Sequence, residues 1–158
     1  MAQKALVVYY SRTGTTRKVA EAIAAMLPCD VEEIVDTKSR SGVGGFLRSG
    51  KDATLKALTT IHEPVKDAAA YDLVVIGTPV WAWTMSTPVR TYISRYADKL
   101  HKVAFFLTTG WTGMDRTFRH MEELSGRKPV AVLGLLMNEV AKGAPTSKVK
   151  AFVAQLGG

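Results

Sequence analysis

The segment "ALVVYYSRTGTT" (residues 5–16) joins six apolar residues to a run of small hydroxyl side chains. The apolar half is typical of a β-strand that is buried on both faces, as the strands of a parallel sheet are. The second half, "SRTGTT" (11–16), stands where the strand gives way to a helical pattern, because Val19, Ile23 and Leu27 recur four residues apart. A strand followed at once by a helix is the repeating unit of a parallel α/β fold.

The same unit recurs along the chain. Apolar runs predict strands over residues 4–10, 29–36, 71–79, 102–110 and 128–137, of which 29–36 is the weakest. Helical patterns fill the connections, and one of them starts with Thr87 as the capping residue and Pro88 in the first turn. The alternation predicts right-handed crossovers and a three-layer α/β fold with a doubly wound, five-stranded parallel sheet.

Length and composition narrow the class of protein. The chain has 158 residues, of which 47 % are hydrophobic, and this predicts one domain over residues 1–158 with a packed core. We expect no membrane span, because no apolar run is long enough, and a cytoplasmic location, because the first residues lack the features of a signal peptide. Cys29 is the only cysteine, so an intrachain disulfide is excluded.

The chain is basic, with a formal net charge of +7. Such a surplus is compatible with nucleic acid, an anionic membrane surface or an acidic protein as partner. A glycine-containing segment, 38–58, carries a net +4 and a helical pattern from about residue 46. Its charged residues are Lys38, Arg40, Arg48, Lys51 and Lys56 against Asp52. We interpret the segment either as a lid or docking surface or as a solvated loop and helix.

Ligands of open parallel sheets bind beyond the carboxyl ends of the strands, so the loops there are the candidate site. The loop "SRTGTT" opens a helix, and its free backbone amides, helix dipole and four hydroxyls suit a phosphate. The alternative is a capped strand–helix turn without a ligand. The patterns G-x-G-x-x-G and G-x-x-x-x-G-K-[ST] are absent, so neither a dinucleotide of the Rossmann type nor a nucleoside triphosphate is indicated.

Two further loops at this edge carry all three tryptophans. "GTPVWAWTMSTP" (77–88) follows the third strand, and "TTGWTGM" (108–114) follows the fourth. A flat aromatic ligand would give exposed indoles a partner, whereas the alternatives are a core edge, an oligomer contact or a plain connection. Taken together, the three loops predict a ligand with a phosphate at one end and a flat ring at the other.

At this point the chain resembles the flavodoxin family over nearly its whole length. "SRTGTT" fits the family's S-x-T-G-x-T phosphate loop, "TPVW" looks like its first flavin-flanking loop, and "TTGWTGM" occupies the place of the second. No long insertion interrupts the last strand, so the chain looks like a short-chain member. The resemblance implies strand order 2-1-3-4-5 and FMN as the cofactor.

The resemblance also implies roles for individual residues. The phosphate would be bound by the hydroxyls of Ser11, Thr13, Thr15 and Thr16 and by the amides of Arg12 and Gly14. The ribityl chain and ring would be flanked by Thr78, Pro79, Val80, Trp81 and Trp83, and on the other side by Thr109, Gly110, Trp111 and Gly113. The flavin would carry the redox chemistry, so no separate catalytic residue and no metal ligand is expected.

The basic charge departs from the family, whose electron-transfer members are typically acidic. We therefore expect an acidic redox protein, or a small anionic or quinone-type substrate, as partner. The leading interpretation is an FMN protein that acts in electron transfer or as a small oxidoreductase. The alternative is a non-redox regulatory or nucleic-acid-associated module on the same fold, although no recognition motif accompanies the charge. The three histidines lack metal-ligand spacing and are expected at the surface.

Overall fold

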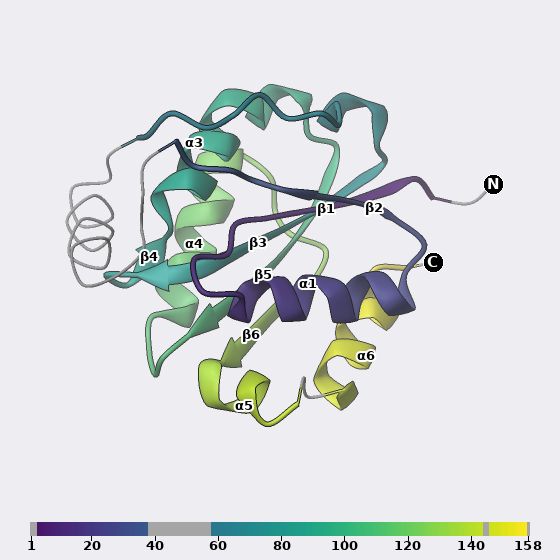
Figure 1. Cartoon of the computed structure of the whole chain (residues 1–158). Helices are drawn as coiled ribbons and strands as arrows, with labels where there is room; N and C mark the ends of the chain where they lie inside the picture. Colours follow the sequence, from purple (N-terminus) through teal and green to yellow (C-terminus); the bar gives the residue numbers. More distant parts are fainter. Residues whose placement is uncertain (1–2, 38–57, 144–145, 158) are drawn as a thin grey trace.

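The computed structural model describes residues 3–37, 58–143 and 146–157, so the predicted basic residues at 38–56 lie outside the described part. Its centre is a parallel sheet in the order β2-β1-β3-β5-β6 (Figure 1). The strands are β1 (Ala5–Tyr9), β2 (Asp30–Glu33), β3 (Leu73–Trp81), β5 (Lys102–Thr109) and β6 (Val132–Leu136). This is the predicted order 2-1-3-4-5, because β5 and β6 are the fourth and fifth long strands. A two-residue strand, β4 (Thr84–Met85), was not predicted and pairs antiparallel with the end of β3.

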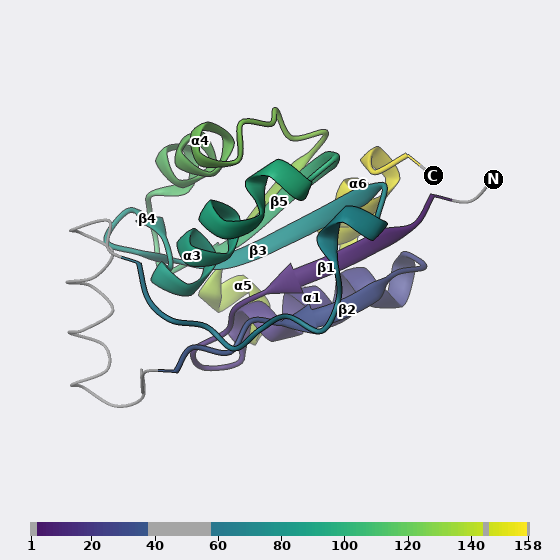
Figure 2. The same ribbon diagram turned by 90° about the horizontal axis from the view of Figure 1, so that it is seen from above.

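Helices cover both faces of the sheet, as the alternation of strands and helices predicts (Figure 2). One layer holds α3 (Thr87–Tyr96) and α4 (Met114–Ser125), and the other holds α1 (Thr15–Met26), α5 (Met137–Ala141) and α6 (Thr146–Gln155). Short 3₁₀ turns, η1 (Ala68–Ala70) and η2 (Ala97–Lys99), precede β3 and β5. The capping residue of α3 is Ser86 rather than Thr87, which lies in the first turn with Pro88.

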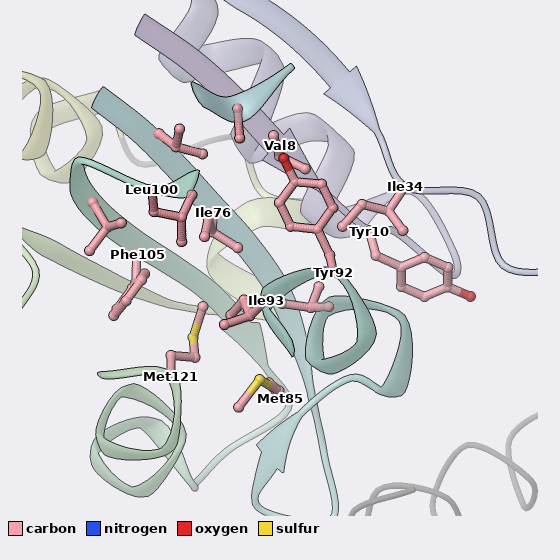
Figure 3. Packing of buried hydrophobic residues seen from close by; sticks show 14 of the residues in the cluster. Val8, Tyr10, Ile34, Ile76, Met85, Tyr92, Ile93, Leu100, Phe105 and Met121 are labelled. Carbon is pink, nitrogen blue, oxygen red and sulfur yellow. The ribbon is translucent and has the colours of Figure 1, made fainter. Parts of the chain in front are cut away.

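Successive residues of each strand point to opposite faces, so one sheet builds two hydrophobic cores. Val8, Ile76 and Phe105 face α3 and α4, where Tyr92 and Met121 pack on them (Figure 3). The neighbouring strand positions face α1 and α6 and form the second core. The inner strands β1, β3 and β5 are therefore buried along nearly their whole length, which made them predictable, whereas β2 at the sheet edge reads DVEE and gave a weaker signal.

Gly77 fixes the packing of β3 on β5 just before the candidate site. It pairs with Phe106, and a Cβ atom at Gly77 would lie 2.0 Å from the Phe106 ring. The ring therefore occupies the space that any side chain at position 77 would need. This close approach anchors the two central strands beside each other where the loops of the site begin.

The described residues contain neither a candidate membrane helix nor a candidate metal-binding cluster. None of their helices is long and apolar enough to cross a bilayer. None of their His, Cys, Asp and Glu side chains form a group of three or more that could hold a metal ion.

Candidate functional site

The carboxyl ends of four strands meet at one cleft. The residues that line it come from the loop after β1, the end of β3, the end of β5 and the start of α5: Arg12, Thr13, Thr15, Thr16, Pro79, Val80, Trp81, Ala82, Thr108, Thr109 and Met137. Eight of these eleven belong to the set predicted from the sequence. Ala82, Thr108 and Met137 do not. The predicted residues Ser11, Gly14, Thr78, Trp83, Gly110, Trp111 and Gly113 surround the cleft without lining it.

Ser11 shapes the loop between β1 and α1. Its hydroxyl oxygen accepts hydrogen bonds from the amides of Gly14 at 3.0 Å and Arg17 at 3.2 Å, and the residue is buried. Both contacts use lone pairs of the oxygen, so the hydroxyl proton of Ser11 is left for another acceptor. The side chain thus holds the loop in shape and remains a donor.

The first turn of α1 presents unused amides to the cleft. Gly14 caps the helix at φ +98°, a left-handed conformation that glycine adopts without strain. Within residues 3–37, 58–143 and 146–157, the amides of Thr13, Thr15 and Thr16 have no protein acceptor. Unpaired amides at the positive end of a helix dipole bind anions, so this loop is built for a phosphate or carboxylate.

Two arginines lie at this loop and differ in their surroundings. Arg17 is paired with Glu33 across the neighbouring strand β2, so its charge is largely compensated there. Arg12 lines the cleft. The side of the cleft that carries the unused amides therefore also carries a cation, which further favours an anionic group.

A pair of buried threonines forms the back of the cleft. The Thr16 and Thr108 hydroxyl oxygens are 2.9 Å apart, and both residues are almost fully buried. One hydroxyl donates to the other, so the second proton of the pair is left for a further acceptor. The bond joins the start of α1 to the end of β5. The sequence pattern identified Thr16 but not Thr108, because the partner is 92 residues away.

A strained hairpin forms the second wall. Trp81 pairs with Thr84, and the two residues between them, Ala82 and Trp83, have φ values of +49° and +63°. Positive φ at both central residues is the pattern of a type I′ turn, which favours asparagine and glycine. Alanine and tryptophan in this conformation cost about 1 kcal/mol or more each. Strain of this kind persists where the surrounding structure holds it, and it is common at functional sites.

The two tryptophans of the hairpin have different environments. Trp81 is buried and meets the Tyr10 ring edge-on, with ring centroids 5.5 Å apart and planes at 89°. Trp83 stands at the tip and is 52 % exposed. Thr78, by contrast, turns its hydroxyl into the hairpin, where it accepts a hydrogen bond from the Ser86 amide at 2.9 Å. Thr78 therefore supports the wall of the cleft from behind.

The loop after β5 closes against this hairpin. Gly113 caps α4 at φ +97°, and a Cβ atom there would lie 3.1 Å from both Trp83 Cα and Val80 Cγ1. The Thr109 hydroxyl donates to the Thr112 carbonyl at 2.7 Å and holds the turn. Trp111, at the crest of the loop, is 83 % exposed. Of the three predicted stacking tryptophans, only Trp81 lines the cleft.

Met137 completes the cleft from the start of α5, a helix too short to show a period in the sequence. Its position depends on Glu139, whose carboxylate accepts from the Leu136 amide at 3.1 Å and from Lys148 Nζ at 2.7 Å. Lys148 first, and then the Leu136 amide, hold the pKa of Glu139 below its usual range. These bonds fix the turn from β6 into α5.

The cleft therefore has two chemically different ends. Amides, hydroxyls and Arg12 come from the loop after β1 and the start of α1, and Val80 and Trp81 bring apolar surface from the end of β3. Such an arrangement can hold a molecule with an anionic group joined to a flat apolar group.

Comparison with known proteins shows which family the chain resembles. The chain is similar to a flavoprotein from Lactobacillus acidophilus solved in complex with FMN, with 27 % identity and a TM-score of 0.74 over 89 % of this chain and 98 % of the other. It is also similar to a protein from Bacteroides eggerthii, with 23 % identity and a TM-score of 0.79 over 97 % of each chain. A two-electron reduced flavodoxin from Megasphaera elsdenii shares the fold at 21 % identity, with a TM-score of 0.58 over 96 % of this chain and 98 % of the other.

No match is found among the curated proteins. The model of the flavodoxin family, however, matches residues 4–155, which include every strand and helix of the sheet and its two covering layers. This match spans the phosphate-type loop, the hairpin and the turn into α5 together. The chain belongs to the flavodoxin family.

Proposed function

We propose that this protein is an FMN-binding flavoprotein that transfers electrons, either to another protein or to a small substrate. One observation carries the proposal: an amide- and hydroxyl-rich loop and an indole-bearing hairpin face the same cleft. The family match and the FMN complex of the Lactobacillus acidophilus relative support it independently of the geometry. FMN has an anionic phosphate and a flat aromatic ring, which match the polar and the apolar end of this cleft.

The phosphate of FMN would lie at the first turn of α1. The amides of Thr13, Thr15 and Thr16 need acceptors, and the Ser11 hydroxyl has a proton to donate. Charge-assisted hydrogen bonds are about twice as strong as neutral ones. The residues at this end therefore supply the kind of donors that a phosphate group needs.

The ring of FMN would lie between the hairpin and the loop after β5. Val80 and Trp81 line this end, and the contact of Gly113 with Trp83 keeps the two loops together. When bound, the flavin supplies the capacity to accept and release electrons and protons. The chain orients the ring, screens part of it from water and sets its polarity through the aromatic and backbone groups around it.

We further propose an acidic protein, or an anionic or quinone-type molecule, as the partner. The net charge of +7 supports this, because opposite charge accelerates encounter. Its effect decays over about 8 Å at physiological salt, so the rate of reduction by an acidic donor protein should fall as salt is added. Reduction by a neutral chemical donor should be insensitive to salt.

The purified protein tests the cofactor directly. We expect a yellow preparation, or a colourless one that takes up one equivalent of FMN with a change in the visible flavin bands. Flavin released by denaturation should co-migrate with FMN and not with riboflavin or FAD. A protein that bound none of the three flavins would contradict the proposal.

A further inference from the structure

Three elements converge on the oxygen of one buried threonine. Thr84 lies in β4, directly after the strained turn, and is almost fully buried. Its hydroxyl oxygen accepts a hydrogen bond from Arg90 Nη2 of α3 at 2.9 Å, and it lies 2.7 Å from His120 Nδ1 of α4. None of these three residues lines the cleft. His120 was expected at the surface with the other two histidines, but it is half-buried and is part of this cluster.

Arg90 is an unusual residue to find in this position. It is 7 % exposed, and burial lowers the pKa of its guanidinium. Its Nε has no hydrogen-bond partner, and in the described part of the chain no carboxylate contacts it. A buried cation without a counter-charge is costly, and an apolar side chain of similar size is often equally or more stable in such a place. Among the described residues, the bond to Thr84 is therefore the only hydrogen bond of the Arg90 guanidinium.

Thr84 is the residue through which this bond reaches the cleft. It pairs with Trp81 across the turn, so the two residues close the hairpin that carries Ala82 and Trp83 at positive φ. The turn sequence does not favour this conformation, and some contact outside the turn must hold it. The Thr84 oxygen, tied to α3 and α4 at once, is the contact best placed to do so.

We propose that Arg90 is a positioning residue, which holds Thr84 and thereby the strained Ala82–Trp83 turn and Trp81 against the cleft. Arg90 cannot itself act on a ligand in the cleft, since it does not line it. The inference concerns the shape of the cleft wall and holds for the ligand-free protein. Only its consequence for FMN affinity rests on the proposed function.

Hydrogen exchange of the ligand-free protein, followed by NMR, tests the proposal. The amides of Trp81 and Thr84 report opening of the hairpin, and those of Val75 and Ile76 report the sheet. Arg90→Met removes the donor and the charge, and Thr84→Val removes the acceptor at constant shape. Because a hydrogen bond to a charged group contributes about 1.5–3 kcal/mol, each change should accelerate hairpin exchange about tenfold or more. Exchange in the sheet should be unchanged.

Matched variants separate positioning from general stability. Arg95→Met removes an arginine that is exposed on the same helix and paired with Glu63, and it should leave hairpin exchange unchanged. Thr84→Ser keeps the hydroxyl and should remain close to the natural protein. Arg90→Lys retains a donor and should recover part of the protection. Ala82→Gly removes strain at position 82, so adding Arg90→Met to it should have a smaller effect than in the natural chain.

Two results would overturn the proposal. One is unchanged hairpin exchange in Thr84→Val, which decides the question even if Arg90→Met does not fold. The other is an equal acceleration of hairpin and sheet amides, which would show a purely global role for the pair. With FMN, Arg90→Met should weaken FMN and riboflavin by the same factor, since the hairpin faces the ring. If no flavin binds, the exchange data still stand, so this inference and the proposed function fail separately.

Discussion

Gly14 and Gly113 have nearly the same backbone conformation but different surroundings. Each caps a helix at the carboxyl edge of the sheet, with φ of +98° before α1 and +97° before α4. A Cβ atom at Gly14 would meet nothing within 4 Å, whereas one at Gly113 would lie 3.1 Å from Trp83 Cα. The first loop is left open for a ligand, and the second is filled by the neighbouring hairpin.

The difference shows how the two ends of the cleft are built. The loop after β1 is shaped by bonds among residues that are close in sequence, such as those from Ser11 to the Gly14 and Arg17 amides. The aromatic end is shaped by contacts between loops that are about thirty residues apart in the chain, such as Gly113 with Val80. We therefore expect changes in the first loop to alter ligand affinity, and changes in the second to alter stability as well.

The largest effect is expected for Gly113→Ala. The left-handed backbone costs an alanine about 1–2 kcal/mol, and crowding against Trp83 and Val80 adds a similar amount. The free energy of unfolding, measured in urea, should fall by about 2–4 kcal/mol. A loss no greater than that of Gly14→Ala would remove the packing difference on which the comparison rests.

Thr13→Ala tests the loop after β1 through its effect on FMN binding. Thr13 is exposed and lines the cleft, so its loss should leave the fold intact while an FMN phosphate loses a donor. FMN affinity, followed by flavin fluorescence, should weaken by about 1–3 kcal/mol, and riboflavin affinity should not change. Ser94→Ala, an exposed hydroxyl on α3, is the control and should affect neither. A parallel loss for both flavins would place Thr13 away from the phosphate.

Gly14→Ala and Gly126→Ala form a matched pair. Gly126 ends α4 at φ +67°, and a Cβ atom there would also meet nothing within 4 Å. Both changes should lower the free energy of unfolding by about 1–2 kcal/mol through backbone strain alone. Only Gly14→Ala should also weaken FMN, because only Gly14 orients amides toward the cleft. If the two variants bound FMN equally well, the loop backbone would have no part in the site.

The tryptophans should show the smallest effects. Trp81 lines the cleft, whereas Trp111 is 83 % exposed at its rim. Aromatic pairs contribute about 0.5–1.5 kcal/mol beyond area burial, so neither change should weaken FMN binding by much more than this. Because Trp81 lines the cleft, Trp81→Phe should relieve more of the quenching of bound flavin than Trp111→Ala. Titration of each variant with FMN gives both affinity and quenching. The reverse order would mean that the exposed loop closes over the ring when the ligand binds.

The sequence was sufficient for the architecture and for most of the residues that line the cleft. Buried strands appear in the sequence as apolar runs. The donors of the loop after β1 lie within the six consecutive residues 11–16, so both features are local patterns. All five long strands and their order were predicted, and eight of the eleven residues that line the cleft were among the expected site residues, whose role in binding stays a prediction.

The remaining features depend on contacts between distant residues. Thr108 could not be identified from the sequence, because what distinguishes it is its hydrogen bond with the distant Thr16. Met137 could not be identified either, because it starts α5, which has only five residues and shows no helical period. Ala82 and Trp83 both have positive φ, a turn conformation that favours asparagine and glycine, so their sequence does not predict this turn. The bonds to Thr84 and the close approach of Gly113 to Trp83 come from outside that turn, and they involve residues of other elements.

Titration of the ligand-free protein with FMN and with riboflavin, under identical conditions, tests the central claim most directly. The two ligands differ only in the phosphate, for which the first turn of α1 holds unpaired amides and the Ser11 hydroxyl. Because several charge-assisted hydrogen bonds at about 1.5–3 kcal/mol each are at stake, FMN should bind at least about 100-fold more tightly. Equal affinities for the two ligands would contradict the account.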